Sequence, residues 1–399
     1  MQNIIIDKPY SFVGPYKSSF WARALQTFLP IYLRREYGIE SIEFRGLDHL
    51  ELSLADRSAV TLTPNHSRPC DPMVMALLSR KIGRPFHYMA SWHVFMQGRL
   101  QAWLINRLGA FSIYREGVDR QAIRAATDLL VKGKRPLVLF PEGVISRTND
   151  VLRPFMDGIS VIAGAASKQR VKLSLSDSVV IHPVAIKYVL LTDPKVSLQR
   201  VLDEIEARFC WQRGDLPLVE RIVKVGEALL ALKELEYLGR VQSGEIAERL
   251  QSLIDYLLDR LEVRWLSGKR QPNFLGRVKA LRAAILKDML ADELTAEERQ
   301  ARWQDLADIY LAVQLSSYPP YYVRSNPTPE RLTETVERLE EDTTDKARIH
   351  GRWHVILEVG APITVSPSYR ESPSCLSQQL QEVTQRMLDS INQGREGTA

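Results

Sequence analysis

The sequence has 399 residues, of which 45% are hydrophobic and 25% charged, a composition typical of a globular protein with a large core and about two domains. Its net charge of +5 is uneven, because residues 1–199 hold 26 Lys/Arg against 16 Asp/Glu, whereas residues 200–399 hold 27 against 32. A basic first half indicates an anionic ligand: a phosphorylated substrate, a coenzyme, lipid headgroups or a nucleic acid. No apolar run is long enough to cross a bilayer, and the N-terminus does not resemble a signal peptide. The three cysteines are widely spaced, which favours a reducing cytosol over a disulfide framework or a zinc site.

Residues 1–45 contain an amphipathic stretch at 20–35, rich in aromatic and aliphatic side chains. Arg23 interrupts it, a pair of arginines ends it, and we expect Pro30 to bend any helix that forms there. Such a helix can lie in a membrane interface with its arginines toward lipid phosphates. It can equally pack on the core of a domain, so the sequence leaves both interpretations open.

Residues 46–194 alternate between strand and helix patterns, which predicts an α/β fold with a central, mostly parallel sheet flanked by helices. Strands are predicted at 41–45, 58–63, 84–90, 110–114, 136–140 and 179–189. Helices are predicted at 73–80, 94–108 and 120–132, and Gly133 ends the last of these.

Residues 195–350 change to helical spacing, with apolar residues every three or four positions, as in the helix predicted at 245–265. Thr295 begins a capping box, and Thr328 is an N-cap followed by proline. We interpret this region as a helical domain without catalytic residues. Acyl-chain selection, a lid and a partner surface are all compatible with its sequence.

A strand pattern returns at 353–365, and a C-terminal helix is predicted at 377–392. A lone strand is not stable by itself, so we expect it to join the earlier sheet. Residues 195–350 are therefore interpreted as a helical insertion, with residues 351–399 returning to the domain that begins at 46.

Asn65 and His66 follow the strand predicted at 58–63, and Asp71 lies five residues past the histidine. Prolines at 64, 69 and 72 disfavour a helix across this segment. The carboxylate of Asp71 can then hold one imidazole tautomer of His66 and leave the other ring nitrogen as a proton acceptor. A His–Asp pair that merely caps a turn is the alternative, so this motif alone does not establish a catalyst.

Two further segments also follow predicted strands. Arg115 ends the stretch that begins at Gly109, and a guanidinium there can bind a phosphate with two hydrogen bonds. A Pro–Glu–Gly turn containing Glu142 and Gly143 leads into Ser146 and Arg147. Ligands of α/β sheets gather at the carboxyl ends of strands, so we expect these segments to converge on the His–Asp turn.

Other motifs are weak or missing. His87 and His93 bracket an apolar stretch and are interpreted as ordinary polar positions. The sequence has no phosphate-binding G-x4-G-K-[ST] loop, so a reaction here needs a donor that arrives already activated. It also lacks a compact Lys/Arg run with interleaved aromatic residues, which argues against a nucleic-acid partner.

In these segments the sequence resembles the glycerolipid acyltransferases, the family of 1-acylglycerol-3-phosphate and glycerol-3-phosphate acyltransferases. The four blocks of that family are matched by Asn65-His66 with Asp71, by Gly109–Arg115, by Phe140–Arg147 and by His182–Ile186. Residues 359–363 resemble the G-x-P-I strand that follows the fourth block in relatives. Block three departs from the family pattern: Val144 stands at the threonine and Ile145 at the first arginine, which leaves only Arg147.

The resemblance implies transfer of a fatty acyl group from acyl-CoA or acyl-carrier protein to 1-acylglycerol-3-phosphate, in phospholipid biosynthesis. His66 would be the general base oriented by Asp71, and backbone N–H groups would form the oxyanion hole. The implied substrate-binding residues are Asn65, Arg115, Glu142, Gly143, Ser146 and Arg147. No metal or cofactor beyond the donor is expected, and no nucleic acid is an expected partner.

We further expect a peripheral protein on the cytoplasmic face of a membrane. Because Ile145 replaces a family arginine, another lysophospholipid or an aminolipid is an alternative acceptor. A lipid-binding protein that keeps the fold without catalysis is the non-enzymatic alternative.

Overall fold

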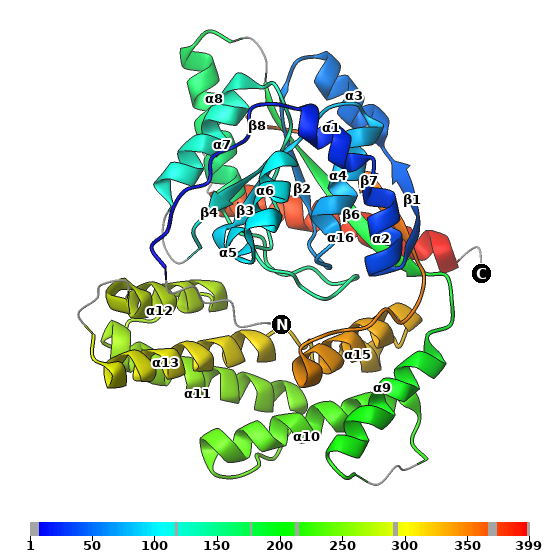
Figure 1. Ribbon diagram of the computed structural model, residues 1–399, viewed down its shortest axis with the longest axis vertical. Helices are drawn as coiled ribbons and strands as arrows, with labels where there is room; N and C mark the ends of the chain where they lie inside the picture. The colour runs from blue at the N-terminus through cyan, green and yellow to red at the C-terminus, as the bar shows by residue number, and fades with distance from the viewer. Residues whose placement is uncertain are drawn as a thin grey trace. The chain divides into compact units, whose positions relative to one another are not determined.

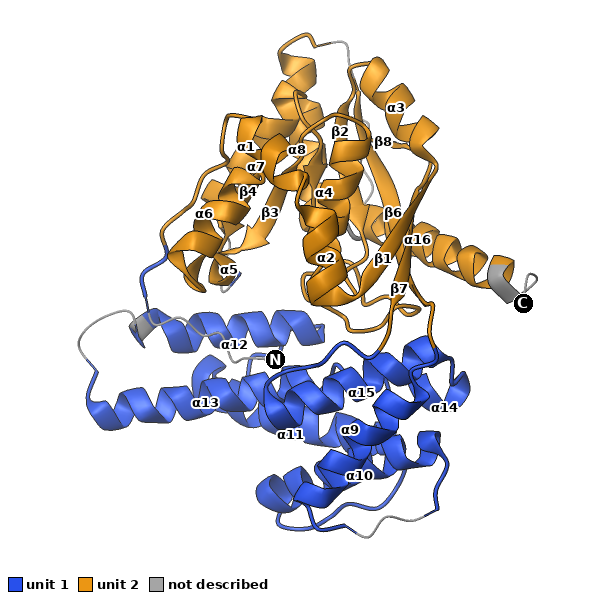
Figure 2. Ribbon diagram, turned by 45° about the vertical axis from the view of Figure 1, so that its right-hand side comes forward, with its two compact units in different colours: residues 1–10, 115–118, 193–350 blue, residues 11–114, 119–192, 351–399 orange. Residues whose placement is uncertain are grey.

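The computed structural model describes residues 8–115, 119–175, 178–211, 215–289, 294–365 and 373–396. The chain divides into two compact units (Figure 2). The helical unit comprises residues 1–10, 115–118 and 193–350, and the sheet unit comprises residues 11–114, 119–192 and 351–399.

A single sheet forms the centre of the sheet unit (Figure 1). Its strands are β1 (Ile39–Arg45), β2 (Ala59–Pro64), β3 (His87–Ser91), β4 (Ala110–Ile113), β5 (Leu137–Val138), β6 (Val179–Leu190), β7 (Trp353–Val359) and β8 (Ile363–Val365). The order is β1-β7-β6-β2-β5-β3-β4, and β8 pairs with β6. Among the described residues, only the β6–β7 and β6–β8 pairs are antiparallel, so the predicted mostly parallel sheet is confirmed.

The strand that returns after residue 350 lies inside this sheet and not at its edge. Leu190 pairs with Trp353 and Val184 with Val359, so β7 runs antiparallel to β6 along its whole length. On its other side β7 runs parallel to β1. The two neighbours satisfy the backbone groups of β7, whose Val355 and Leu357 side chains are buried in the core.

Helices cover both faces of the sheet (Figure 1). They are α1 (Phe20–Gln26), α2 (Leu29–Tyr37), α3 (Leu47–Ala55), α4 (Asp71–Lys81), α5 (Trp92–Met96), α6 (Arg99–Arg107), α7 (Arg120–Lys132), α8 (Gly158–Lys172) and α16 (Pro373–Glu396). Successive strand residues point to opposite faces. Val60 therefore belongs to one core cluster with α2 and α4, whereas Ala59 belongs to another with α7, α8 and α16.

Two predicted helices differ in detail. The bend expected at Pro30 is wrong, because α1 ends before Thr27 and Pro30 lies in the first turn of α2. A proline is tolerated there since the first helical N–H groups have no partner inside the helix. The helix predicted at 94–108 is divided into α5 and α6, with Gly98 between them.

The helical unit contains α9 (Lys195–Arg208), α10 (Leu218–Leu238), α11 (Ile246–Leu266), α12 (Phe274–Met289), α13 (Ala296–Leu315), α14 (Tyr322–Ser325) and α15 (Pro329–Thr344). The capping box of Thr295 with Glu298 is confirmed, and so is the N-cap Thr328 followed by Pro329.

An internal repeat of 28 residues, which our reading of the sequence missed, organises α9 to α12. Each of three arginines lies in the first turn of its helix and makes two hydrogen bonds, through Nε and Nη2, to a glutamate near the end of the preceding helix. The pairs are Arg221–Glu206, Arg249–Glu234 and Arg277–Glu262. Buried leucines at 202, 230, 258 and 286 keep the same period. Each repeat contains one helix and one connection, and the same type of ion pair joins each helix to the one before it.

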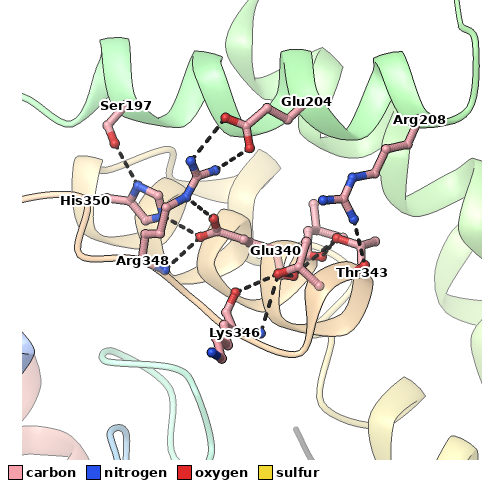
Figure 3. A network of polar contacts seen from close by, with 10 residues as sticks. Ser197, Glu204, Arg208, Glu340, Thr343, Lys346, Arg348 and His350 are labelled. Atoms are coloured by element: carbon pink, nitrogen blue, oxygen red, sulfur yellow. Dashed lines mark hydrogen bonds and ion pairs between the residues drawn. The ribbon is translucent and has the colours of Figure 1, made fainter.

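A polar network joins the segments by which the chain enters and leaves the helical unit (Figure 3). Arg348 binds Glu204 of α9 at 3.1 and 2.7 Å and also pairs with the buried Glu340 of α15. His350 binds Glu340 at 2.8 Å and Ser197 of α9 at 2.8 Å. Burial acts to raise the pKa of Glu340, but hydrogen bonds from His350 and Arg348 outweigh it and hold that pKa below its ordinary value.

Candidate active site

The loop between β2 and α4 carries His66 and begins with an asparagine that continues the sheet. The amide of Asn65 donates to the carbonyl of Ile186 at 3.0 Å and accepts from its N–H at 2.7 Å. A side chain thus takes the place of the next β2 residue in the ladder with β6. The Asn65 side chain is 1% exposed, and its two hydrogen bonds to Ile186 hold the chain at the point where it leaves β2.

His66 and Asp71 form the predicted pair. Asp71 is the first residue of α4 and is fully buried, and its Oδ2 lies 2.9 Å from Nδ1 of His66. Because a carboxylate only accepts hydrogen bonds, Nδ1 carries the proton of the neutral ring and Nε2 has a free lone pair. Within the described part of the chain Nε2 makes no hydrogen bond, and the imidazole is 15% exposed.

The carboxylate of Asp71 is held by two further donors. The backbone N–H of Arg68 donates to Oδ2 at 2.9 Å, and the hydroxyl of Tyr188, on β6, donates to Oδ1 at 2.5 Å. Full burial of the tyrosine raises the pKa of its hydroxyl well above the ordinary value. The hydroxyl therefore remains a protonated donor. Sequence reasoning missed Tyr188 because 117 residues separate it from Asp71 and no local motif links the two.

Glu142 supports the histidine from the neighbouring segment after β5. Its Oε1 accepts the backbone N–H of His66 at 2.6 Å, and its Oε2 accepts that of Arg153 at 3.0 Å. Burial raises the pKa of Glu142 to about 7, although both backbone bonds act against the shift. The carboxyl group is fully buried, and its described contacts bridge two loops of the protein.

The turn after Glu142 brings Ser146 to the same loop. The backbone N–H and the hydroxyl of Ser146 both donate to the carbonyl of His66, at 2.7 and 3.1 Å. Gly143 has a φ of +70°, a conformation that favours glycine, and a Cβ there would lie 2.4 Å from Sδ of Met156, whose partly exposed side chain would have to move. Arg147 adopts a φ of +59°, a strained conformation for a residue with a side chain.

Asn149 is a second supporting residue that the sequence did not reveal. Its amide donates to the carbonyl of Tyr188 at 2.5 Å and accepts from its N–H at 2.8 Å, as Asn65 does two residues earlier on β6. Both asparagines therefore extend the hydrogen bonding of β6 beyond the end of β2. A Thr-Asn-Asp sequence is too common in loops to indicate this role.

The structure thus brings together Asn65, His66, Asp71, Glu142, Gly143, Ser146 and Arg147, all within the sheet unit. Arg115 is exposed, lies two residues after β4 and is grouped with the helical unit. Its participation in the site stays a prediction. His87, by contrast, is buried on β3, and burial lowers its pKa to about 4.

Comparison with known proteins shows a similarity that covers this part of the chain. Residues 41–187 match a family model described as Acyltransferase. The chain is also 33% identical, over 96 residues, to a 1-acyl-sn-glycerol-3-phosphate acyltransferase of Streptococcus pneumoniae (strain ATCC BAA-255 / R6). The match covers 24% of this chain and 34% of that relative, so the chain spans about a third of the relative's length. Residues 41–187, which hold the whole His66 cluster, are therefore similar to acyltransferase domains.

Proposed function

We propose that this protein transfers a fatty acyl group from acyl-CoA or acyl-carrier protein to the hydroxyl of 1-acylglycerol-3-phosphate in phospholipid biosynthesis. The observation that carries the proposal is the ring of His66, whose Nδ1 is bound to the buried Asp71 while Nε2 remains open as a base. The resemblance of residues 41–187 to acyltransferases supports the same chemistry.

In the proposed reaction Nε2 of His66 takes the proton of the acceptor hydroxyl as its oxygen attacks the thioester carbon. Asp71 stabilises the imidazolium that forms. The tetrahedral intermediate then collapses, an ester C–O bond remains, the C–S bond breaks, and the imidazolium returns its proton to the departing thiolate. No protein nucleophile, metal or cofactor besides the acyl donor is required.

Among the residues predicted to bind substrate, we propose phosphate contacts for Arg147 and Arg115. The strained backbone of Arg147, one residue past Ser146, supports a functional role for its side chain. Asn65, Glu142 and Ser146 use their polar atoms to hold the histidine loop, so direct contact with substrate stays a prediction for them. Gly143 keeps the turn compact.

We also propose that the sheet unit binds the cytoplasmic surface of a membrane through α1 and α2. Leu29 and Leu33 pack inward, whereas Phe28 and Ile31 are 67% and 70% exposed, so α2 presents a second apolar surface to solvent. An open groove of about 680 Å³ lies between α2, β1 and α4, and Arg34, Arg80 and Lys81 are among its lining residues. Exposed apolar side chains next to arginines suit an anionic lipid surface. No helix in the described residues is long and apolar enough to cross a membrane.

An assay of thiol release from the acyl donor by the purified full chain tests the reaction. Its acceptors are lysophosphatidate, other lysophospholipids and aminolipids. We expect His66→Ala to lower kcat by about 10²–10⁴, the usual size of general-base effects, and the exposed His49→Ala control to leave it unchanged. Equal turnover in both variants would refute the mechanism. Because Ile145 replaces a family arginine, turnover only with less anionic acceptors would assign the alternative substrate. Lipid binding without turnover would support the non-catalytic reading.

Co-sedimentation with vesicles tests the membrane surface. Phe28→Ser and Ile31→Ser should weaken binding to vesicles that contain anionic lipid, whereas Leu52→Ser, an equally exposed leucine on α3, should not. Failure of the unaltered chain to bind vesicles of either charge would refute this part of the proposal.

A further inference from the structure

Tyr188 lies outside all four of the matched blocks, and it binds the oxygen of Asp71 that His66 does not. Its hydroxyl donates to Oδ1 of Asp71, whereas the imidazole binds Oδ2. The two oxygens of one carboxylate therefore divide their negative charge between the tyrosine and the histidine. A stronger bond on one side leaves less charge for the other.

The tyrosine is held from four directions. The amide of Asn149 binds both the backbone N–H and the carbonyl of Tyr188. The ring of Trp353 contacts the tyrosine ring edge-on, with 6.3 Å between the centroids. The guanidinium of Arg68 lies over the rings of Tyr188 and Trp353, 5.2 and 4.0 Å from their centroids. Sγ of Cys70 lies 3.3 Å from the hydroxyl. These contacts fix the direction of the buried Tyr188 hydroxyl, which donates to Oδ1 of Asp71.

From this geometry we infer that Tyr188 is a positioning residue for acyl transfer, which sets the strength of the Asp71–His66 hydrogen bond. The inference rests on the proposed function. Tyr188 does not touch the reacting atoms, and it acts through the carboxylate. Its removal would leave Oδ1 without this donor, concentrate charge on the carboxylate and make the protonated imidazole more stable.

We expect replacement of Tyr188 to leave the charges of the other ionisable groups around the His66–Asp71 pair unchanged. Arg68 and Cys70 face Tyr188 from the histidine loop, and burial raises the pKa of the Cys70 thiol to about 12, so the thiol stays neutral. Tyr37, from the end of α2, lies close to Cys70, and burial keeps its hydroxyl protonated as well. Glu142 accepts the backbone N–H of His66, and the charge of Arg153 acts on its carboxyl group.

Tyr188→Phe tests the inference in the full chain, first without substrate. NMR of ring-labelled histidine, with the His66 signal assigned by its loss in His66→Ala, follows the pH at which the ring gains its proton. We expect that midpoint to move upward in Tyr188→Phe by on the order of half to one pH unit. Site-specific 3-fluorotyrosine, a stronger donor, should move it downward. Tyr88→Phe is the matched control, because its buried hydroxyl on β3 makes no hydrogen bond in the described residues.

The pH–rate profile provides the second readout. The acidic limb of kcat should move in the same direction as the NMR midpoint, with kcat at low pH reduced and KM for the acceptor unchanged. An NMR midpoint in Tyr188→Phe equal to that of Tyr88→Phe would overturn the inference even if the protein is an active acyltransferase. A shifted midpoint in a protein without turnover would uphold the coupling of Tyr188 to His66 while refuting the proposed function.

Discussion

Replacing Glu142 by glutamine distinguishes a residue that holds His66 from one that binds substrate. The carboxyl group accepts two backbone N–H groups, from His66 and Arg153, through different oxygens. Glutamine offers one oxygen and one NH₂ group, so one buried N–H then faces a donor. Leaving such a group unsatisfied costs about 1–3 kcal/mol.

The pH dependence sharpens the expected result. Burial raises the pKa of Glu142 from 4.5 to about 7, so the folded state favours its protonated form. The associated stability is fully present below pH 4.5 and is lost as the pH rises through about 7; a shift of this size corresponds to roughly 3 kcal/mol. Glutamine has no such loss. We therefore expect Glu142→Gln to be less stable than the unaltered chain by about 2 kcal/mol at pH 5 and nearly equal to it at pH 8.

Calorimetry at the two pH values measures this difference, which at pH 5 amounts to a Tm decrease of about 4–8 °C for a unit of this size. Glu51→Gln, exposed on α3, is the control. In kinetics, displacement of the His66 backbone should lower kcat and leave KM for the acceptor unchanged. Equal destabilisation at both pH values would refute the role of burial, and a raised KM with unchanged kcat would assign Glu142 to substrate binding.

Three further predictions concern other parts of the chain. Gly143→Ala should lower both stability and kcat, because alanine is strained at the positive φ of this turn and its Cβ would also displace the Met156 side chain; a melting curve unchanged from that of the unaltered chain would contradict this. Arg249→Ala should destabilise the helical unit by about 3–5 kcal/mol in urea unfolding, because Glu234 is left buried without its ion pair, and a paired Arg249→Met, Glu234→Leu variant should recover most of that loss. Since the pKa of Glu340 is held below its ordinary value, its contribution is present above the unfolded-state pKa and is lost as the pH falls through the folded one. The helical unit should therefore lose stability in acid, and Glu340→Gln should flatten that acid dependence when unfolding is followed by circular dichroism.

The sequence determined the local parts of this protein. The prolines around His66, the spacing to Asp71 and the turn at Gly143 act within a few residues, and the structure places all three where the motifs predict. The sheet was predicted because strands and helices alternate along the chain. The capping box of Thr295 was equally readable, since both of its hydrogen bonds join residues three apart.

Only the tertiary structure decided which distant groups meet the histidine. Tyr188 and Asn149 acquire their roles because β6 and the segment after β5 lie beside the same loop, and no local pattern records that adjacency. The segment with Glu142 was expected near His66, but its bond to the His66 backbone N–H was not. The 28-residue repeat lies between these cases. Its period can be seen in the sequence, but only the structure shows that its arginines and glutamates form buried ion pairs between successive helices. Short-range chemistry is determined by neighbours along the chain, whereas the strength of a buried hydrogen bond depends on everything that excludes water from it.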